Sequence, residues 1–284
     1  MNLVWLLILG AIWGSSYLFI KVAVAEVPPL TLVAARLALA AAILWVLLLV
    51  TRQRVPRDRR VWAIFAVMGV LNGVLPYSLI TWSEQTISSG LAALLQATMP
   101  LFTVLLAHFL LRDERLTATK VVGIVLGFAG VGVLMLPDLK QGAQANVLAQ
   151  LAMVASSVSY AGAALVARSQ LRHQAPLVST AGQLVCGAAI MVPLSLLVDG
   201  PPRTVPSAAA VWSWLALTLL GTVVAYIIYY GLIKRTSATF TSLVTYLIPV
   251  AGLVLGWLVL DEPLHLGLFA GLGLILAGVL LVRR

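Results

Sequence analysis

The chain has 284 residues, of which 62% are hydrophobic and 10% are charged. A soluble domain is roughly 45–50% apolar and about 25% charged, so this composition excludes an ordinary soluble fold and indicates an integral membrane protein. The formal net charge of +9 does not indicate a nucleic-acid partner, because the basic residues lie between apolar runs, where orientation signals are expected.

Ten apolar runs follow one another along the chain. Each is long enough for a transmembrane helix, which needs about 20 apolar residues. The predicted spans are 3–24, 30–50, 61–81, 88–110, 118–136, 146–167, 177–198, 211–231, 238–260 and 265–282. The first run begins at Leu3 without a basic segment before it, so we interpret it as a retained span and not as a cleaved signal peptide. We expect an all-α integral membrane protein with a single membrane domain, 1–284.

Lysines and arginines are divided unequally between alternate connections. With a cytoplasmic N-terminus, fourteen of the eighteen fall on the cytoplasmic side. These are Arg52, Arg54, Arg57, Arg59, Arg60, Arg112, Arg115, Lys120, Arg168, Arg172, Lys234, Arg235, Arg283 and Arg284. Only Lys21, Lys140 and Arg203 fall outside, and Arg36 lies within the second run. Because cytoplasmic loops carry the excess of basic residues, we expect both termini to be cytoplasmic.

The second half of the chain repeats the layout of the first. Segments 88–136 and 237–282 each contain a span with an internal proline, an Asp-Glu pair and a glycine-laced span. The corresponding positions are Pro100 and Pro249, Asp113-Glu114 and Asp261-Glu262, Gly123 and Gly271, and Gly130 and Gly278. Trp13 corresponds to Tyr160 at looser register, and Pro29 to Pro176. We therefore expect two five-helix repeats, 1–137 and 146–284.

Five spans are an odd number, so the second repeat must enter the membrane from the opposite side. The two acidic pairs then lie on opposite faces, with Asp113-Glu114 inside and Asp261-Glu262 outside. An inverted-topology repeat is typical of secondary transporters, whose two halves expose one central site alternately. The alternative is that duplication only builds a stable helical bundle.

These features carry a resemblance to a known family. The opening GAIWGSSYLFIKVAV, the two five-span units, and the run Pro100, twelve residues, Asp113-Glu114 followed by a glycine-laced span resemble the EamA repeat of the drug/metabolite transporter superfamily. The resemblance covers essentially the whole chain. Within that superfamily the chain is most similar to the bacterial amino-acid exporter branch, which includes an exporter of aromatic amino acids. The resemblance implies a ten-helix transporter in the bacterial inner membrane.

Polar aromatic and amide side chains recur in corresponding spans of both halves. Trp13 and Tyr17 are four residues apart and share one helix face. The candidate cavity-lining residues are Trp13, Tyr17, Asn72, Tyr77, Trp82, Gln96, Tyr160, Tyr226, Tyr230 and Tyr246. Such a set would line a cavity around a pseudo-twofold axis. The alternative is that the aromatic members are interfacial anchors, as we expect for Trp214.

Ionisable residues within or next to the spans are few. Arg36 lies about two turns inside the second span, where it could receive a substrate carboxylate; the alternative is a structural role, snorkelling outward or pairing with Glu84. Glu84 and His108 lie near span ends and are candidates for a charge or coupling role. Since no carboxylate or histidine lies deep in a span, we expect a facilitator or a weakly coupled carrier.

Pro100 and Pro249 lie near the middle of the fourth and ninth spans. A proline removes one helical hydrogen bond, so each is a candidate hinge. A passive kink that improves packing is the alternative.

Features of enzymes and pumps are missing. The three histidines lie at loops or span ends, Cys186 has no second cysteine, and no phosphate-binding Gly-Lys motif is present. We therefore expect no enzyme activity, no cofactor and no metal site. The favoured function is export of amino acids, including aromatic or large apolar ones. Export of another metabolite or drug, or a membrane scaffold or sensor, are the alternatives. A monomer and a homodimer through the glycines of the fifth and tenth spans both remain open.

Overall fold

A computed structural model describes residues 1–111, 115–201 and 204–283. These ranges form helices and contain no strand, which confirms the all-α prediction. The acidic pair Asp113-Glu114 and the arginines Arg112, Arg203 and Arg284 lie outside the described residues.

The helices follow the predicted spans closely. They are α1 (Asn2–Val24), α2 (Pro29–Val50), α3 (Arg59–Gly69), α4 (Leu75–Ser83), α5 (Ser89–Gln96), α6 (Met99–Leu110), α7 (Ala118–Gln141), α8 (Gln144–Gln170), α9 (Pro176–Val198), α10 (Ala208–Thr218), α11 (Ala225–Arg235), α12 (Ala238–Thr241), α13 (Val244–Leu260) and α14 (Leu266–Val282). Two π-helical turns, η1 (Val70–Val74) and η2 (Leu219–Val224), join α3 to α4 and α10 to α11. The predicted span 238–260 is divided between α12 and α13.

Eight helical segments of the described chain are long and apolar enough to cross a membrane, and two are shorter. The shorter ones, α13 and α14, have 17 residues each and rise about 25 Å, somewhat less than the roughly 30 Å hydrocarbon core. Large apolar side chains cover the outside of the bundle, where Leu49 is 65% exposed and Leu197 is 83% exposed. An apolar exterior of this extent suits contact with a lipid bilayer.

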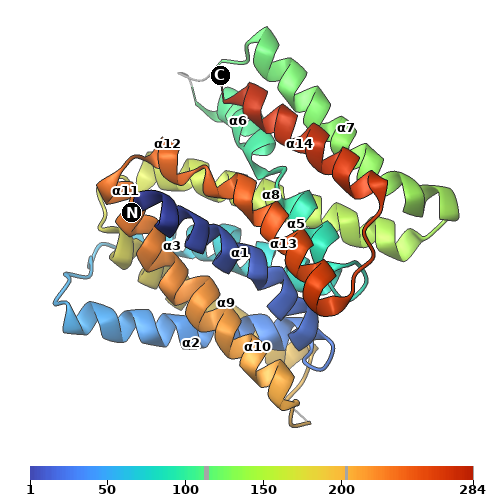
Figure 1. Ribbon diagram of the computed structural model, residues 1–284. Coiled ribbons are helices and arrows are strands. Elements are labelled where there is room, and N and C mark those ends of the chain that lie inside the picture. The colour runs from blue at the N-terminus through green and yellow to red at the C-terminus, as the bar shows by residue number, and fades with distance from the viewer. Residues whose placement is uncertain (112–114, 202–203, 284) are drawn as a thin grey trace.

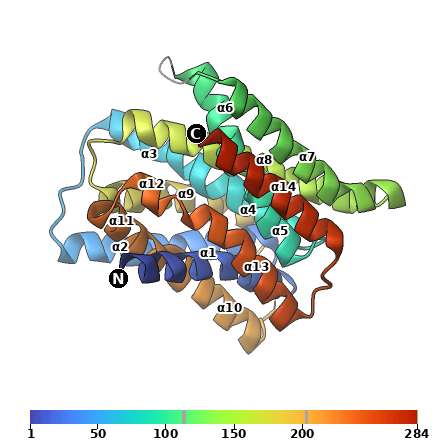
Figure 2. The same cartoon turned by 45° about the horizontal axis from the view of Figure 1, so that its top comes forward.

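The first and second halves of the chain pack against each other at almost every helix. Helix α1 packs on α13 and α10, α2 on α9, and α8 on α4, α5 and α6. Helices α7 and α14 lie side by side along one edge of the bundle (Figures 1 and 2). The two halves therefore share one core and do not form separate lobes.

Glycines allow the close approach of α7 and α14. A Cβ atom added to Gly123 would lie 2.7 Å from the Gly278 carbonyl oxygen, and one added to Gly130 would lie 2.8 Å from the Gly271 carbonyl oxygen. Only glycine fits such contacts without displacing backbone. These glycines of the fifth and tenth predicted spans are thus occupied by packing within one chain.

The two ends of the bundle differ in charge. At one end the loops carry five acidic residues, and we call it the acidic end: Glu26, Glu84, Asp199, Asp261 and Glu262. At the other end basic residues predominate, and we call it the basic end: Arg52, Arg54, Arg57, Arg172 and Arg283.

Candidate functional site

Aromatic rings from α1 and α11 form the centre of the candidate site. Tyr226, Tyr229 and Tyr230 lie on one face of α11, since residues three and four apart are neighbours on a helix. The ring of Trp13 meets Tyr226 edge-on at a centroid distance of 6.4 Å and lies 5.4 Å from Tyr229. Tyr226 and Tyr230 stack at 5.9 Å. The result is a continuous aromatic surface inside the bundle.

The π-helical turn η1 presents an amide to these rings. The Asn72 side-chain nitrogen donates to the Tyr226 hydroxyl at 3.1 Å and to the Gln183 side-chain oxygen at 3.3 Å. A π-helical turn shifts the backbone hydrogen bonds, which makes carbonyl groups available to other donors. The Leu71 carbonyl oxygen indeed accepts from the Ser159 hydroxyl at 2.8 Å. The turn thus joins α8, α9 and α11 through polar contacts.

Arg36 of α2 is buried on the other side of the same region. Its Nε donates to the Thr222 hydroxyl in η2 at 3.1 Å, and its guanidinium carbon lies 3.9 Å from the centre of the Tyr77 ring. Arg36 is 6% exposed. No carboxylate of the described residues forms an ion pair with it, so the expected alternative of pairing with Glu84 is not found there. A buried cation without an acidic partner is costly and is therefore a candidate for ligand binding.

Tyrosine hydroxyl groups from three further elements converge on this arginine. Tyr160 of α8 lies near Tyr77, Arg36, Tyr17 and Tyr226. Tyr17 and Tyr77 are buried, whereas Tyr160 and Tyr226 are half-buried although they lie among the other groups. The two half-buried rings keep part of their surface exposed.

The polar contacts form two similar sets of three residues. We call them the Arg36 trio and the Gln183 trio: Arg36, Thr222 and Tyr77 in the first, and Gln183, Asn72 and Tyr226 in the second. Gln183 follows Arg36 by 147 positions, and Tyr226 follows Tyr77 by 149. Each trio combines a long polar side chain, a residue of a π-helical turn and a tyrosine.

Gln96 ends α5, where the fourth span is interrupted before α6. Its side-chain oxygen accepts from the Ser156 hydroxyl at 2.7 Å, and its buried side-chain nitrogen has no hydrogen-bond partner within the part of the chain that the structure describes. Pro100 lies in the first turn of α6, directly after this interruption. Pro249 instead lies inside the continuous helix α13, and the ninth span is interrupted earlier, between α12 and Val244. The hinge role of both prolines stays a prediction.

Four predicted site residues lie away from this region. Trp82 of α4 is 40% exposed. Tyr246 lies beneath the Arg283 guanidinium, whose carbon is 4.5 Å from the ring centre. His108 packs edge-on against Phe109 near the end of α6. Glu84 is buried at the acidic end.

Small polar residues of the site were missed in the sequence, because the search favoured aromatic and charged groups. Thr222, Ser156 and Thr180 contact the predicted residues Arg36, Gln96 and Tyr230, the last through the Tyr230 hydroxyl at 3.1 Å. Ser159 instead bonds the carbonyl of Leu71, which precedes the predicted Asn72. Gln183 carried a usable signal, since an amide deep in an apolar span is costly unless it is hydrogen-bonded.

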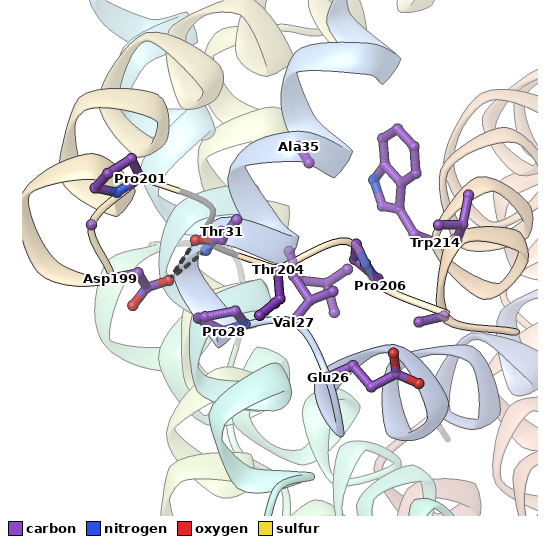
Figure 3. Close-up of a pocket in the computed structure, with 14 residues that line it drawn as sticks. Glu26, Val27, Pro28, Thr31, Ala35, Asp199, Pro201, Thr204, Pro206 and Trp214 are labelled. Carbon is purple, nitrogen blue, oxygen red and sulfur yellow. Dashed lines mark hydrogen bonds between the residues drawn. The ribbon is translucent and has the colours of Figure 1, made fainter. Parts of the chain in front are cut away.

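A cavity of about 510 Å³ opens at the acidic end between α2 and α10. Figure 3 shows Ala35 and Trp214 on its two sides, with Pro206 and Thr204 between them. Trp214, expected to be an interfacial anchor, thus lines a cavity. At the rim, one Asp199 carboxylate oxygen accepts from the Thr31 amide at 2.7 Å and from its hydroxyl at 2.9 Å (Figure 3).

Two more carboxylates at the acidic end cap helices of the opposite half. Glu26 accepts from the Ser207 amide at 2.7 Å and from its hydroxyl at 2.6 Å, and these bonds hold the pKa of this exposed carboxyl below its usual value. Glu262 accepts from the amides of Ser89 and Gly90 at 2.7 and 2.9 Å. A carboxylate at a helix N-terminus satisfies free amides and interacts favourably with the helix dipole. These contacts hold the acidic end together.

The described residues contain no group of three or more histidine, cysteine or acidic side chains that could hold a metal ion. The site consists of one cation, amides, hydroxyls and aromatic rings. This chemistry suits binding and positioning of a small molecule.

Known proteins similar to this chain match it over nearly its whole length. The EamA-like transporter family matches residues 1–136 and, a second time, residues 147–284. The uncharacterized transporter YoaV of Bacillus subtilis (strain 168) is 26% identical over 268 residues, which is 94% of this chain and 91% of YoaV. The uncharacterized inner membrane transporter YedA of Escherichia coli (strain K12) is 27% identical over 273 residues, 95% of this chain and 87% of YedA.

Protein PecM of Dickeya dadantii (strain 3937) is 26% identical over 274 residues, 96% of this chain and 89% of PecM. A solved crystal structure that is 20% identical superposes with a TM-score of 0.68 and covers 99% of this chain and 96% of that chain. At this identity the likeness shows the fold alone.

Proposed function

The chain belongs to the EamA-like transporter family, and from this we propose that it exports amino acids, including aromatic and large apolar ones, by alternating access. It is a multi-pass membrane transporter with a small-molecule substrate, not an enzyme. We place it in the bacterial inner membrane, in line with the name of its relative YedA.

The observation that carries the choice of substrate is the buried Arg36, which pairs with no carboxylate of the described residues. A guanidinium binds a carboxylate through two parallel hydrogen bonds. The rings of Trp13, Tyr226 and Tyr230 lie in the same region and can pack against an aromatic or aliphatic side chain, while their faces attract an ammonium group. A zwitterion with a large side chain matches this combination.

Alternating access requires two halves that can exchange conformations, and we infer that 1–137 and 146–284 are inverted repeats with both termini cytoplasmic. Three observations support this. The family matches the chain twice. The π-helical turns η1 and η2 occur at corresponding places in the third and eighth spans. Helix α1 packs on α13 and α10 as α8 packs on α5 and α4.

The test uses purified protein in liposomes loaded with radiolabelled L-phenylalanine. We expect efflux that excess L-leucine and L-tryptophan inhibit, whereas phenylalaninamide, which lacks the carboxylate, inhibits at least about tenfold more weakly because the charge-assisted bonds to Arg36 are missing. Protein-free liposomes are the control.

Equal inhibition by phenylalanine and its amide would contradict the role of Arg36. Absence of flux with any amino acid would favour another metabolite or drug as substrate, or a scaffold or sensor without transport. Screening of other carboxylates in the same liposomes separates these two.

A further inference from the structure

Glu84 differs from the other carboxylates of the acidic end. It caps the C-terminus of α4 and is 0% exposed. Neither of its carboxylate oxygens has a hydrogen-bond partner among the described residues. Glu26, Asp199 and Glu262 each accept hydrogen bonds from a helix N-terminus. Burial without hydrogen-bond partners disfavours an ionised carboxylate, so this conformation favours the protonated form of Glu84.

Lys21 of α1 is close to Glu84 but does not pair with its carboxylate. The Lys21 ammonium donates to the Glu84 carbonyl oxygen at 2.6 Å and to the Ile87 carbonyl oxygen at 2.8 Å. Lys21 therefore connects α1 to the turn that joins α4 and α5. Helix α5 is the first part of the interrupted fourth span, so this tie joins α1 to a segment that contains Gln96.

A cavity of about 260 Å³ lies beside this pair at the acidic end. It is lined by Lys21, Val24, Ala25, Glu84 and Gln85. A space of this size holds several water molecules, which can exchange a proton with the Glu84 carboxyl once its side chain turns toward them.

The titratable groups that face Glu84 are Tyr17 and Lys21 of α1 and Glu262 of the loop before α14. Burial raises the pKa of the Glu84 carboxyl well above its usual value; the Lys21 ammonium lowers it and the Glu262 carboxylate raises it. The position 149 residues later is Ile233, so the second half has no matching acid.

We propose that Glu84 and Lys21 form a proton-binding site at the acidic end and that transport is coupled to the protonation of the Glu84 carboxyl. This rests on the proposed transport function. The sequence left a facilitator and a weakly coupled carrier open and named Glu84 and His108 as coupling candidates; the proposal chooses a coupled carrier and Glu84.

The coupling step follows from the contacts. When the Glu84 O–H bond breaks, the proton passes to water in the adjoining cavity and a carboxylate remains. The carboxylate attracts the Lys21 ammonium and so competes with the carbonyls of Glu84 and Ile87 for its hydrogen bonds. The contact between α1 and the turn before α5 then shifts from these two carbonyls to the Glu84 side chain. Protonation restores the bonds to the two carbonyls, so the bound proton favours the arrangement of α1 and this turn that the structure shows.

The experiment measures transport of L-phenylalanine in proteoliposomes in two ways: as counterflow with the same pH inside and outside, and as net efflux with an imposed pH gradient. For the unchanged protein we expect the gradient to change net efflux about fivefold or more. Glu84→Gln should keep counterflow within about twofold and lose the response to the gradient, because the amide cannot exchange a proton. Glu26→Gln, an exposed carboxylate at the same end, should keep the response.

The proposal would be overturned if net efflux by Glu84→Gln responded to the pH gradient as strongly as efflux by the unchanged protein. It would also be overturned if the unchanged protein showed counterflow but no response to the gradient. Absence of counterflow instead counts against the amino-acid substrate. Lys21→Gln removes the ammonium that links the acid to α1 and should lose the response to the gradient. A full response to the gradient in this variant would also overturn the proposal.

Thermal unfolding in detergent tests the site without a substrate. A carboxyl whose pKa is raised in the folded state binds more protons when folded, so stability falls as pH rises above the unfolded pKa of about 4.3. Compared with the unchanged protein, Glu84→Gln should therefore gain melting temperature as the pH rises from about 5 to about 8. Parallel pH curves for the two proteins would contradict a protonated Glu84.

Discussion

The Arg36 trio and the Gln183 trio have the same construction but a different charge. In one, the guanidinium bonds Thr222 of η2 and covers the Tyr77 ring; in the other, the Gln183 amide bonds Asn72 of η1, which also bonds Tyr226. A symmetric pair of halves would give a symmetric site. The single positive charge makes the site polar and gives a zwitterion one preferred orientation.

The largest effect is expected for Arg36→Gln, which removes the charge difference between the two trios by making both neutral. We expect phenylalanine efflux to fall about 30- to 100-fold, because charge-assisted bonds to a carboxylate are lost. Inhibition by phenylalaninamide should change little. Gln183→Asn, which keeps the amide in the other trio, is the matched control. Efflux of Arg36→Gln within about threefold of the unchanged protein would assign Arg36 a structural role.

The roles of the two tyrosines predict different effects of the same substitution. Tyr226 uses its hydroxyl, which accepts from Asn72, whereas Tyr77 offers its ring to Arg36. Tyr226→Phe leaves the amide short of an acceptor and should lower efflux about fivefold. Tyr77→Phe keeps the ring and should lower it less than about twofold. Initial rates of phenylalanine efflux, measured in the same liposomes, test this difference. An equal loss of efflux in both variants would contradict the different roles of the two tyrosines.

Most of the fold was predictable from the sequence, because apolar runs bounded by charged loops have few other solutions in a membrane. The interruption between α12 and α13 was not, since no proline lies there and Pro249 is inside α13. The π-helical turns also gave no local signal. They depend on contacts such as Ser159 with the Leu71 carbonyl, which form only after the helices pack.

The site was predictable in part for a similar physical reason. Aromatic and amide side chains within apolar spans mark positions that face other helices, and Trp13, Asn72, Tyr77, Tyr160, Tyr226 and Tyr230 do meet. Which of them face each other depends on helix crossings between distant segments. The position of Thr222 beside Arg36 follows from α2 packing on η2, 186 residues apart in sequence, and no local pattern contains it.

A substitution at Thr222 is expected to act mainly on KM and sharpens the comparison most, because it separates the position of Arg36 from its charge. Thr222→Val keeps the shape of the side chain and removes the hydroxyl that accepts from the Arg36 Nε. The guanidinium keeps its contact with Tyr77 but loses one of its two fixed points, so we expect KM for phenylalanine to rise about two- to fourfold with little change in maximal rate. Thr218→Val is the matched control, since the Thr218 hydroxyl bonds only the Trp214 carbonyl one turn earlier in α10. If both variants shift KM equally, the effect belongs to the packing of this span. If only Thr222→Val does, the π-helical turn η2 positions the charge that makes the two trios different.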